Sequence, residues 1–86
     1  MLEIRYKPAF LRSFKKLPVG LQQEIAERIA LFRDNPKNPT LRTHNLKGEL
    51  KGRWSFSVNY YIRIVFRFEG KHSVVLLAVG DHDVYR

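Results

Sequence analysis

Apolar and polar positions alternate at the start of the chain and then change to a helical spacing. Leu2, Ile4 and Tyr6 alternate with charged residues, which is the period of a half-buried strand. Pro8 ends this pattern, and between residues 10 and 17 the apolar positions form one stripe at helical spacing, with basic residues on the opposite side. The chain is therefore predicted to begin with a strand that is followed by a short amphipathic helix.

A second and longer apolar stripe follows Pro18. It is made of Leu21, Ile25, Ile29 and Phe32. This helix is expected to end near Asp34, because the Asn35–Pro36 step disfavours further helical turns. Residues 35–45 contain two prolines and little periodicity, so they are predicted to form a loop.

Three strand-like segments follow the glycines at positions 48 and 52. Residues 53–58 and 62–68 alternate between apolar and polar side chains, whereas residues 73–79 are apolar on both faces, as in a central strand. A glycine-containing turn at residues 69–71 connects the last two segments. This order predicts an α+β fold in one domain, residues 1–86: two N-terminal helices packed on one face of a small, mainly antiparallel four-stranded sheet (β-α-α-β-β-β).

The two-residue period of these strands also predicts the composition of the other sheet face. If Trp54, Phe56 and Ile64 point at the helices, the intervening residues share the helix-free face. These residues are Arg53, Ser55, Ser57, Asn59, Arg63 and Arg67. We therefore expect an open, basic and polar concavity on that face.

The charge of the chain narrows the class of its partners. Sixteen Lys and Arg residues against eight Asp and Glu residues give a formal net charge of +8, which favours nucleic acid, an anionic membrane or an acidic protein. No apolar run approaches the roughly 20 residues of a membrane span. No signal segment opens the chain, so we expect a cytoplasmic protein without membrane contact.

The absence of cysteine excludes several kinds of chemistry. Disulfides, thiolate nucleophiles and cysteine-ligated zinc all require that residue. The histidines at positions 44, 72 and 82 and the scattered carboxylates have no metal-ligand spacing. Neither a metal site nor a cofactor is expected.

Four short motifs follow one another in the second half of the chain. They are Leu46-Lys47-Gly48, Trp54–Val58, Ile62–Phe66 and Val79–Tyr85. In this order, in a basic chain of this length, they resemble the RelE/ParE superfamily of toxins. The resemblance implies the RelE-like fold and the toxin of a type II toxin–antitoxin system. It further implies a metal-independent endoribonuclease (mRNA interferase) that cuts messenger RNA on the ribosome and inhibits translation. A cognate acidic antitoxin would hold the toxin, which is expected to be a monomer when free and part of a hetero-oligomer in the complex.

The resemblance also implies the reaction and the residues that perform it. A ribose 2′-hydroxyl attacks the adjacent phosphate and leaves a cyclic phosphate and a free 5′-hydroxyl. This reaction needs a base for the 2′-proton, cations for the phosphate charge and an acid for the leaving oxygen. The catalytic residues implied by the resemblance are Arg63, His82, Tyr85 and His44.

Each of these four residues also has a purely structural interpretation. The Arg63 guanidinium can hold two phosphate oxygens, or it can be a solvated strand arginine. The His82 imidazole can exchange a proton near neutral pH, or it can be a polar residue in a terminal turn. Tyr85 can stack on a base, or it can pack the end of the last strand. His44, in the predicted loop, matches a second histidine of YafQ-like toxins, or it is an ordinary exposed histidine.

Further residues are expected to contact the RNA. These are Lys47, Lys51, Arg53, Ser55, Ser57 and Arg67. The basic ones would neutralise phosphates in a salt-sensitive way that is independent of base sequence, and a solvated basic rim is the plainer interpretation.

The chain also departs from the family pattern. RelE-like toxins have lysines where Ser55 and Ser57 stand, which leaves the general base open between His82 and His44. A ParE-like DNA gyrase inhibitor and a catalytically inactive RelE-fold binding module are the alternative functions, although His82 and Tyr85 argue against the gyrase inhibitor.

Overall fold

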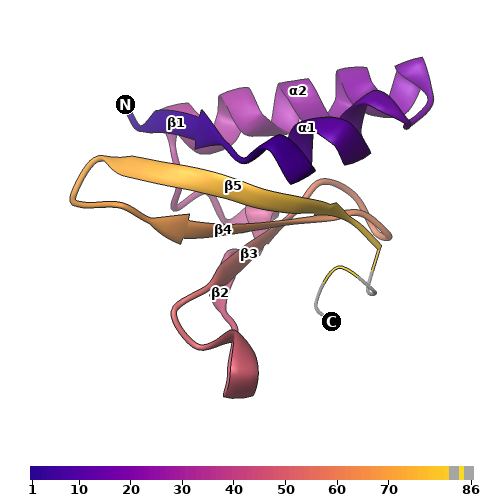
Figure 1. The fold of residues 1–86 in the computed structure, drawn as a ribbon. Helices are drawn as coiled ribbons and strands as arrows, with labels where there is room; N and C mark the ends of the chain where they lie inside the picture. Colours follow the sequence, from indigo (N-terminus) through magenta and orange to yellow (C-terminus); the bar gives the residue numbers. More distant parts are fainter. Residues whose placement is uncertain (82–83, 85–86) are drawn as a thin grey trace.

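The computed structural model describes residues 1–81 and 84, and its principal elements follow the predicted order (Figure 1). Two helices lie on one face of a sheet. The principal elements are β1 (Glu3–Tyr6), α1 (Pro8–Lys15), α2 (Val19–Asp34), β3 (Trp54–Ser57), β4 (Arg63–Phe68) and β5 (Ser73–Gly80). The predicted two-helix α+β arrangement is therefore confirmed. Within the described part of the chain, neither helix is long and apolar enough to span a membrane.

The sheet has five strands in the order β1-β5-β4-β3-β2, so the prediction of four strands was wrong. The additional strand is β2 (His44–Asn45), which pairs antiparallel with Ser55 and Trp54 of β3. Two residues are too few to show an alternating pattern, and only the pairing with a remote segment makes them a strand. The sheet is mixed, because β1 runs parallel to β5 while the other pairs are antiparallel.

The predicted loop between α2 and β3 contains local structure besides β2. Two short 3-10 helices, η1 (Pro39–Leu41) and η2 (Gly48–Leu50), lie on either side of β2. Arg42 follows η1 with a φ of 51°, a left-handed conformation that turns the chain toward β2. In Figure 1, η2 projects below the sheet, on the side away from the helices.

Helix α1 begins at Pro8, whose missing N–H costs nothing at the first helical position. Phe10 is buried, and its ring stacks on that of Phe14 at 6.2 Å between centroids. In helix α2, Ile25, Ile29 and Phe32 are buried, in agreement with the predicted stripe. The apolar face of each helix therefore joins the core of the domain.

An aromatic cluster joins α2 to the sheet. The Phe32 ring stacks on Phe56 of β3 at 4.3 Å and meets Phe66 of β4 edge-on at 4.8 Å. Aromatic pairs of this kind are worth about 0.5–1.5 kcal/mol beyond the area they bury. The predicted core face of β3 and β4 is confirmed, because Phe56, Ile64 and Phe66 are all fully buried.

Strand β5 is an interior strand, paired on both sides with β1 and β4 as its two apolar faces predicted, and it contains a β-bulge. Val65 pairs with Ala78 and Phe66 pairs with Leu76, so Leu77 has no partner on β4. The extra residue brings Val79 to the core face together with Leu76, although the two are an odd number of positions apart. Ala78 is left on the helix-free face.

The helix-free face is less open than the sequence suggested. Ser55 is 0% exposed and Val65 is 2% exposed. On this side Val84 lies over the end of β5, where a Cβ built on Gly80 would be 3.7 Å from the Val84 Cβ. The middle of the expected polar concavity, at Ser55 and Val65, is therefore buried and not open to solvent.

Asn59 does not belong to that face, and its predicted placement was wrong. Its side-chain oxygen accepts hydrogen bonds from the backbone N–H groups of Tyr61 and Ile62, each at 2.8 Å, and its amide nitrogen donates to Glu24 of α2. Asn59 therefore caps the β3–β4 turn and ties it to the helix, because its side chain satisfies the turn locally.

Candidate nucleic-acid interface

A row of paired residues crosses the helix-free face from β2 to β5. His44 is opposite Ser55, Ser55 is opposite Val65, and Val65 is opposite Ala78. Directly paired residues place their side chains on the same face of a sheet. The strand pairing therefore puts His44 on the helix-free face, whereas the sequence had placed it in a loop.

The hydrogen bond of His44 indicates which ring nitrogen is available for chemistry. Its Nδ1 lies 3.0 Å from the backbone carbonyl oxygen of Arg42, and the residue is exposed. A carbonyl oxygen can only accept, so in the neutral ring Nδ1 carries the hydrogen and Nε2 keeps its lone pair. This is the tautomer that a general base needs.

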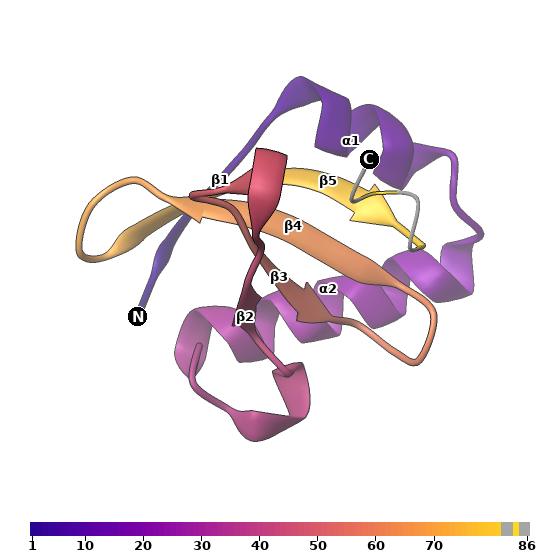
Figure 2. The same cartoon turned by 90° about the horizontal axis from the view of Figure 1, so that it is seen from below.

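A basic groove of about 580 Å³ lies on the same side of the molecule. Among the residues that the structure describes, its lining includes four cationic side chains and no carboxylate, and its floor is apolar. The four cationic residues are Lys7, Arg12, Arg53 and Arg67. Figure 2 looks onto the helix-free side, where α1, which contributes Arg12, is seen near β5.

The groove concentrates positive charge that the protein only partly neutralises. Continuing the pairing of Trp54 with Phe66 by one residue sets Arg53 opposite Arg67, and like charges in that position repel. Arg67 has a partner at the rim, because its Nη2 lies 3.7 Å from Glu69 Oε2. Among residues 1–81 and 84, no carboxylate forms an ion pair with Lys7, Arg12 or Arg53. An incoming anion would relieve this repulsion.

Arg63 lies in a second, smaller hollow of about 250 Å³ beside the β3–β4 turn. Its Nη1 donates to the backbone carbonyl oxygens of Asn59 at 2.8 Å and Tyr60 at 3.2 Å. Arg28 and Arg42 line the same hollow. The side chain therefore caps the turn through Nη1, and the described part of the chain provides no hydrogen-bond partner for its other two nitrogens.

The two basic hollows lie toward opposite ends of β4. Arg63, Val65 and Arg67 alternate on one face of that strand, and four residues of strand span about 13 Å. His44 pairs into the row between them, two strands away. The helix-free face therefore has cationic side chains near each end of β4, and the row of paired residues that contains His44 lies between them.

The remaining predicted residues are distributed as follows. Ser55 is fully buried and Ser57 is 9% exposed. These small side chains stand at the positions where the family pattern described above has lysines. The contact of the two serines with RNA stays a prediction. Lys47 and Lys51 are exposed on either side of η2. His82 and Tyr85 lie outside the described residues, so their roles also stay predictions.

The sequence did not identify four basic residues that line the two hollows: Lys7, Arg12, Arg28 and Arg42. Arg12 was visible as part of the polar side of the first helix. Its position at the groove depends on where α1 lies relative to β5, which local periodicity does not encode. No group of three histidine or carboxylate side chains that could hold a metal is found within the part of the chain that the structure describes.

No protein-family model and no curated protein sequence matches the chain. Several solved structures are similar to it over nearly its whole length. The RelBE2 toxin–antitoxin complex from Mycobacterium tuberculosis contains a chain 26% identical, with a TM-score of 0.74, covering 94% of this chain and 98% of that one. YafQ from E. coli strain BL21(DE3) is 15% identical, with a TM-score of 0.79 and coverage of 99% and 98%. The YoeB–YefM complex from Staphylococcus aureus contains a chain 19% identical, with a TM-score of 0.74 and coverage of 95% and 98%.

Proposed function

We propose, on the premise that the chain belongs by its fold to the RelE/ParE toxin superfamily, that it is the toxin of a type II toxin–antitoxin system. Its proposed activity is cleavage of messenger RNA on the ribosome without a metal ion. The observation that carries this proposal is the basic groove, in which, among residues 1–81 and 84, four cations and no carboxylate surround an apolar floor. Such a surface attracts the RNA backbone independently of base sequence.

In the proposed mechanism the RNA strand lies along β4 between the two cationic ends of the face. His44 Nε2 takes the proton of a ribose 2′-hydroxyl, whose oxygen attacks the neighbouring phosphorus. Arg63 turns its remaining guanidinium donors toward the phosphate and stabilises the charge that builds up there. The bond from phosphorus to the 5′-oxygen breaks, and His82 gives that oxygen its proton. A cyclic phosphate and a free 5′-hydroxyl result.

Mapping the 5′ ends of messages in a translation reaction tests this proposal. Wild-type protein is expected to produce new ends that carry a 5′-hydroxyl, and Arg63→Ala and His82→Ala are each expected to reduce them at least a hundredfold. Arg33→Ala is the matched control, because this exposed arginine on α2 lines neither basic hollow. Full cleavage by both site variants would refute the assigned roles.

A catalytically inactive binding module is the second candidate. It is favoured by the burial of Ser55 and Ser57 at the positions of the usual strand lysines. Ribosome binding without any new message ends would support it over the nuclease. The third candidate, gyrase inhibition, predicts that the purified protein blocks DNA supercoiling, and we expect supercoiling to be unaffected.

The proposed partner is an acidic antitoxin protein. Two of the similar structures, from Staphylococcus aureus and Mycobacterium tuberculosis, are described as toxin–antitoxin complexes. The net charge of +8 on this chain favours an acidic protein as its counterpart. Co-expression with the product of the neighbouring reading frame is expected to restore growth.

A further inference from the structure

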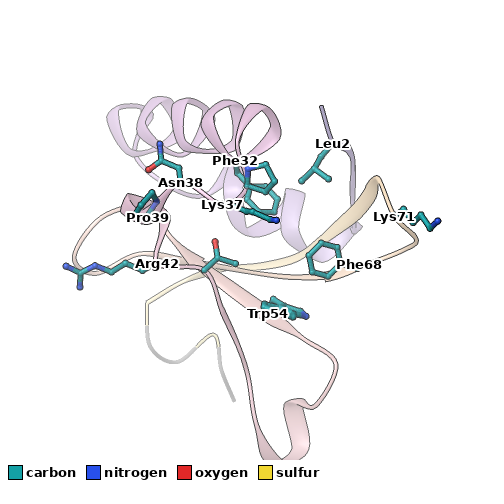
Figure 3. Close-up of a pocket in the computed structure, with 11 residues that line it drawn as sticks. Leu2, Phe32, Lys37, Asn38, Pro39, Arg42, Trp54, Phe68 and Lys71 are labelled. Carbon is teal, nitrogen blue, oxygen red and sulfur yellow. The ribbon is translucent and has the colours of Figure 1, made fainter.

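An apolar hollow of about 640 Å³ opens on the helix-bearing side, away from the basic groove (Figure 3). Its apolar wall is formed by Leu2 from the start of the chain, Phe32 from α2, Trp54 from β3 and Phe68 from β4. Residues 36–39, 42 and 43, from the segment that connects α2 to β2, form another side. None of these apolar residues belongs to the candidate nuclease site.

Two aromatic rings of this hollow, Trp54 and Phe68, are packed against neighbours but not fully covered. Trp54 and Phe68 meet edge to face at 5.5 Å, and Phe68 meets Phe66 of the core at 5.4 Å. Phe68 is nevertheless 45% exposed. A ring that is held in place by its neighbours and still faces water is a preorganised contact for an apolar side chain, which would remove that surface from water.

The hollow also contains a polar atom without a partner. The hydroxyl oxygen of Thr43, which lines the hollow, is buried and forms no hydrogen bond with any residue that the structure describes. A buried hydroxyl normally has a partner, because leaving it unpaired is unfavourable. A backbone group of an entering segment could supply that hydrogen bond.

The cationic side chains at the rim of the hollow favour an acidic occupant. Lys37, Arg42 and Lys71 are on the lining, and no Asp or Glu of the described part of the chain joins them there. In Figure 3 the Arg42 and Lys71 side chains extend outward at opposite ends of the site. Carboxylates that flank an apolar side chain would meet these cations and would be steered to them.

We propose that this hollow is the docking site for an acidic segment of the protein that neutralises the toxin. A large apolar side chain of that segment packs between Leu2, Trp54 and Phe68, its carboxylates meet the cationic rim, and a backbone group pairs with the Thr43 hydroxyl. This inference rests on the proposed function for the existence of such a partner. The mostly apolar lining on the opposite side of the sheet from the basic groove favours a protein segment over RNA.

The fluorescence of Trp54 tests the proposal directly, because it is the single tryptophan of the chain. The probe is the purified product of the adjacent reading frame, together with overlapping peptides that cover it. Binding is expected to shift the Trp54 emission to shorter wavelength, because the indole loses contact with water. Phe68→Ala and Lys71→Glu are each expected to weaken binding at least tenfold.

Matched controls are available on the same chain. Val19→Ala removes an apolar side chain that is 68% exposed and lines none of the hollows, and Lys15→Glu reverses an exposed charge that does not line them either. Both control variants are expected to bind like wild type. Unchanged affinity of the Phe68→Ala variant, binding without any change in Trp54 emission, or no binding to wild type would each overturn the proposal.

Two further measurements separate this proposal from its alternatives. If a single-stranded RNA produces the Trp54 shift and Phe68→Ala abolishes it, the hollow is an RNA site and the docking proposal fails. Messenger RNA cleavage by the same preparations is expected to be equal for wild type and Phe68→Ala. A wild-type protein that binds the probe through Phe68 but cuts no message would refute the nuclease alone, so the two failures are distinguishable.

Discussion

Replacing Lys7 and Arg12 with alanine removes two of the four cations that line the basic groove. Four cations can neutralise at most about four phosphates, which for single-stranded nucleic acid gives a slope of about −2.8 in log affinity against log salt. With two cations left, the slope falls to about −1.4. A fourfold rise in salt should therefore weaken binding about 50-fold for wild type and about 7-fold for the double variant.

The assay is fluorescence anisotropy with a labelled RNA whose 2′-hydroxyls are methylated, so that binding is measured without cleavage. The control is the double variant Lys15→Ala with Lys16→Ala, which removes the same charge just beyond Arg12 but outside the groove. Only a specific role for the groove predicts different slopes for the two double variants. Equal slopes would mean that net charge alone governs binding, and the groove would lose its assigned role.

Three further predictions concern the core, the base and the turn. Phe32→Ala should lower the free energy of unfolding by about 3–5 kcal/mol in denaturant titrations, because the ring is fully buried between Phe56 and Phe66; a loss below about 1 kcal/mol would contradict that packing. His44→Ala should reduce the rate of message cleavage about 10²–10⁴-fold with little change in RNA affinity, and an unchanged rate would exclude His44 as the base. Asn59→Ala should cost about 1–3 kcal/mol in thermal unfolding, because two backbone N–H groups lose their acceptor, and full stability would disprove the cap.

The secondary structure was largely predictable because its signals are local. A stripe of apolar side chains, with Pro8 at one end and Asn35–Pro36 at the other, marks the extent of the two helices in the chain itself. Alternation in residues 54–68 similarly identifies both the strands and the face that joins the core. These elements follow from side chains that are neighbours in sequence.

The fifth strand and the position of His44 were not predictable in this way. Two residues have no measurable period, and His44 becomes part of the sheet only because Ser55, 11 residues later, pairs with it. The position of Asn59 was likewise not predictable from the strand alternation. Its side chain accepts hydrogen bonds from backbone N–H groups within the turn and donates one to a carboxylate on α2, so it does not point to the helix-free face.

For the candidate site, the amino-acid order by itself determined that Arg53, Arg63 and Arg67 share the helix-free face, because side chains two residues apart on a strand point the same way. Only the tertiary structure decided that Arg63 turns to the β3–β4 turn, that Ser55 is buried, and that Lys7 and Arg12 complete the groove. The reason is physical: local periodicity defines the two sides of each element, whereas the neighbours of each side are selected by packing between segments that are remote in the chain.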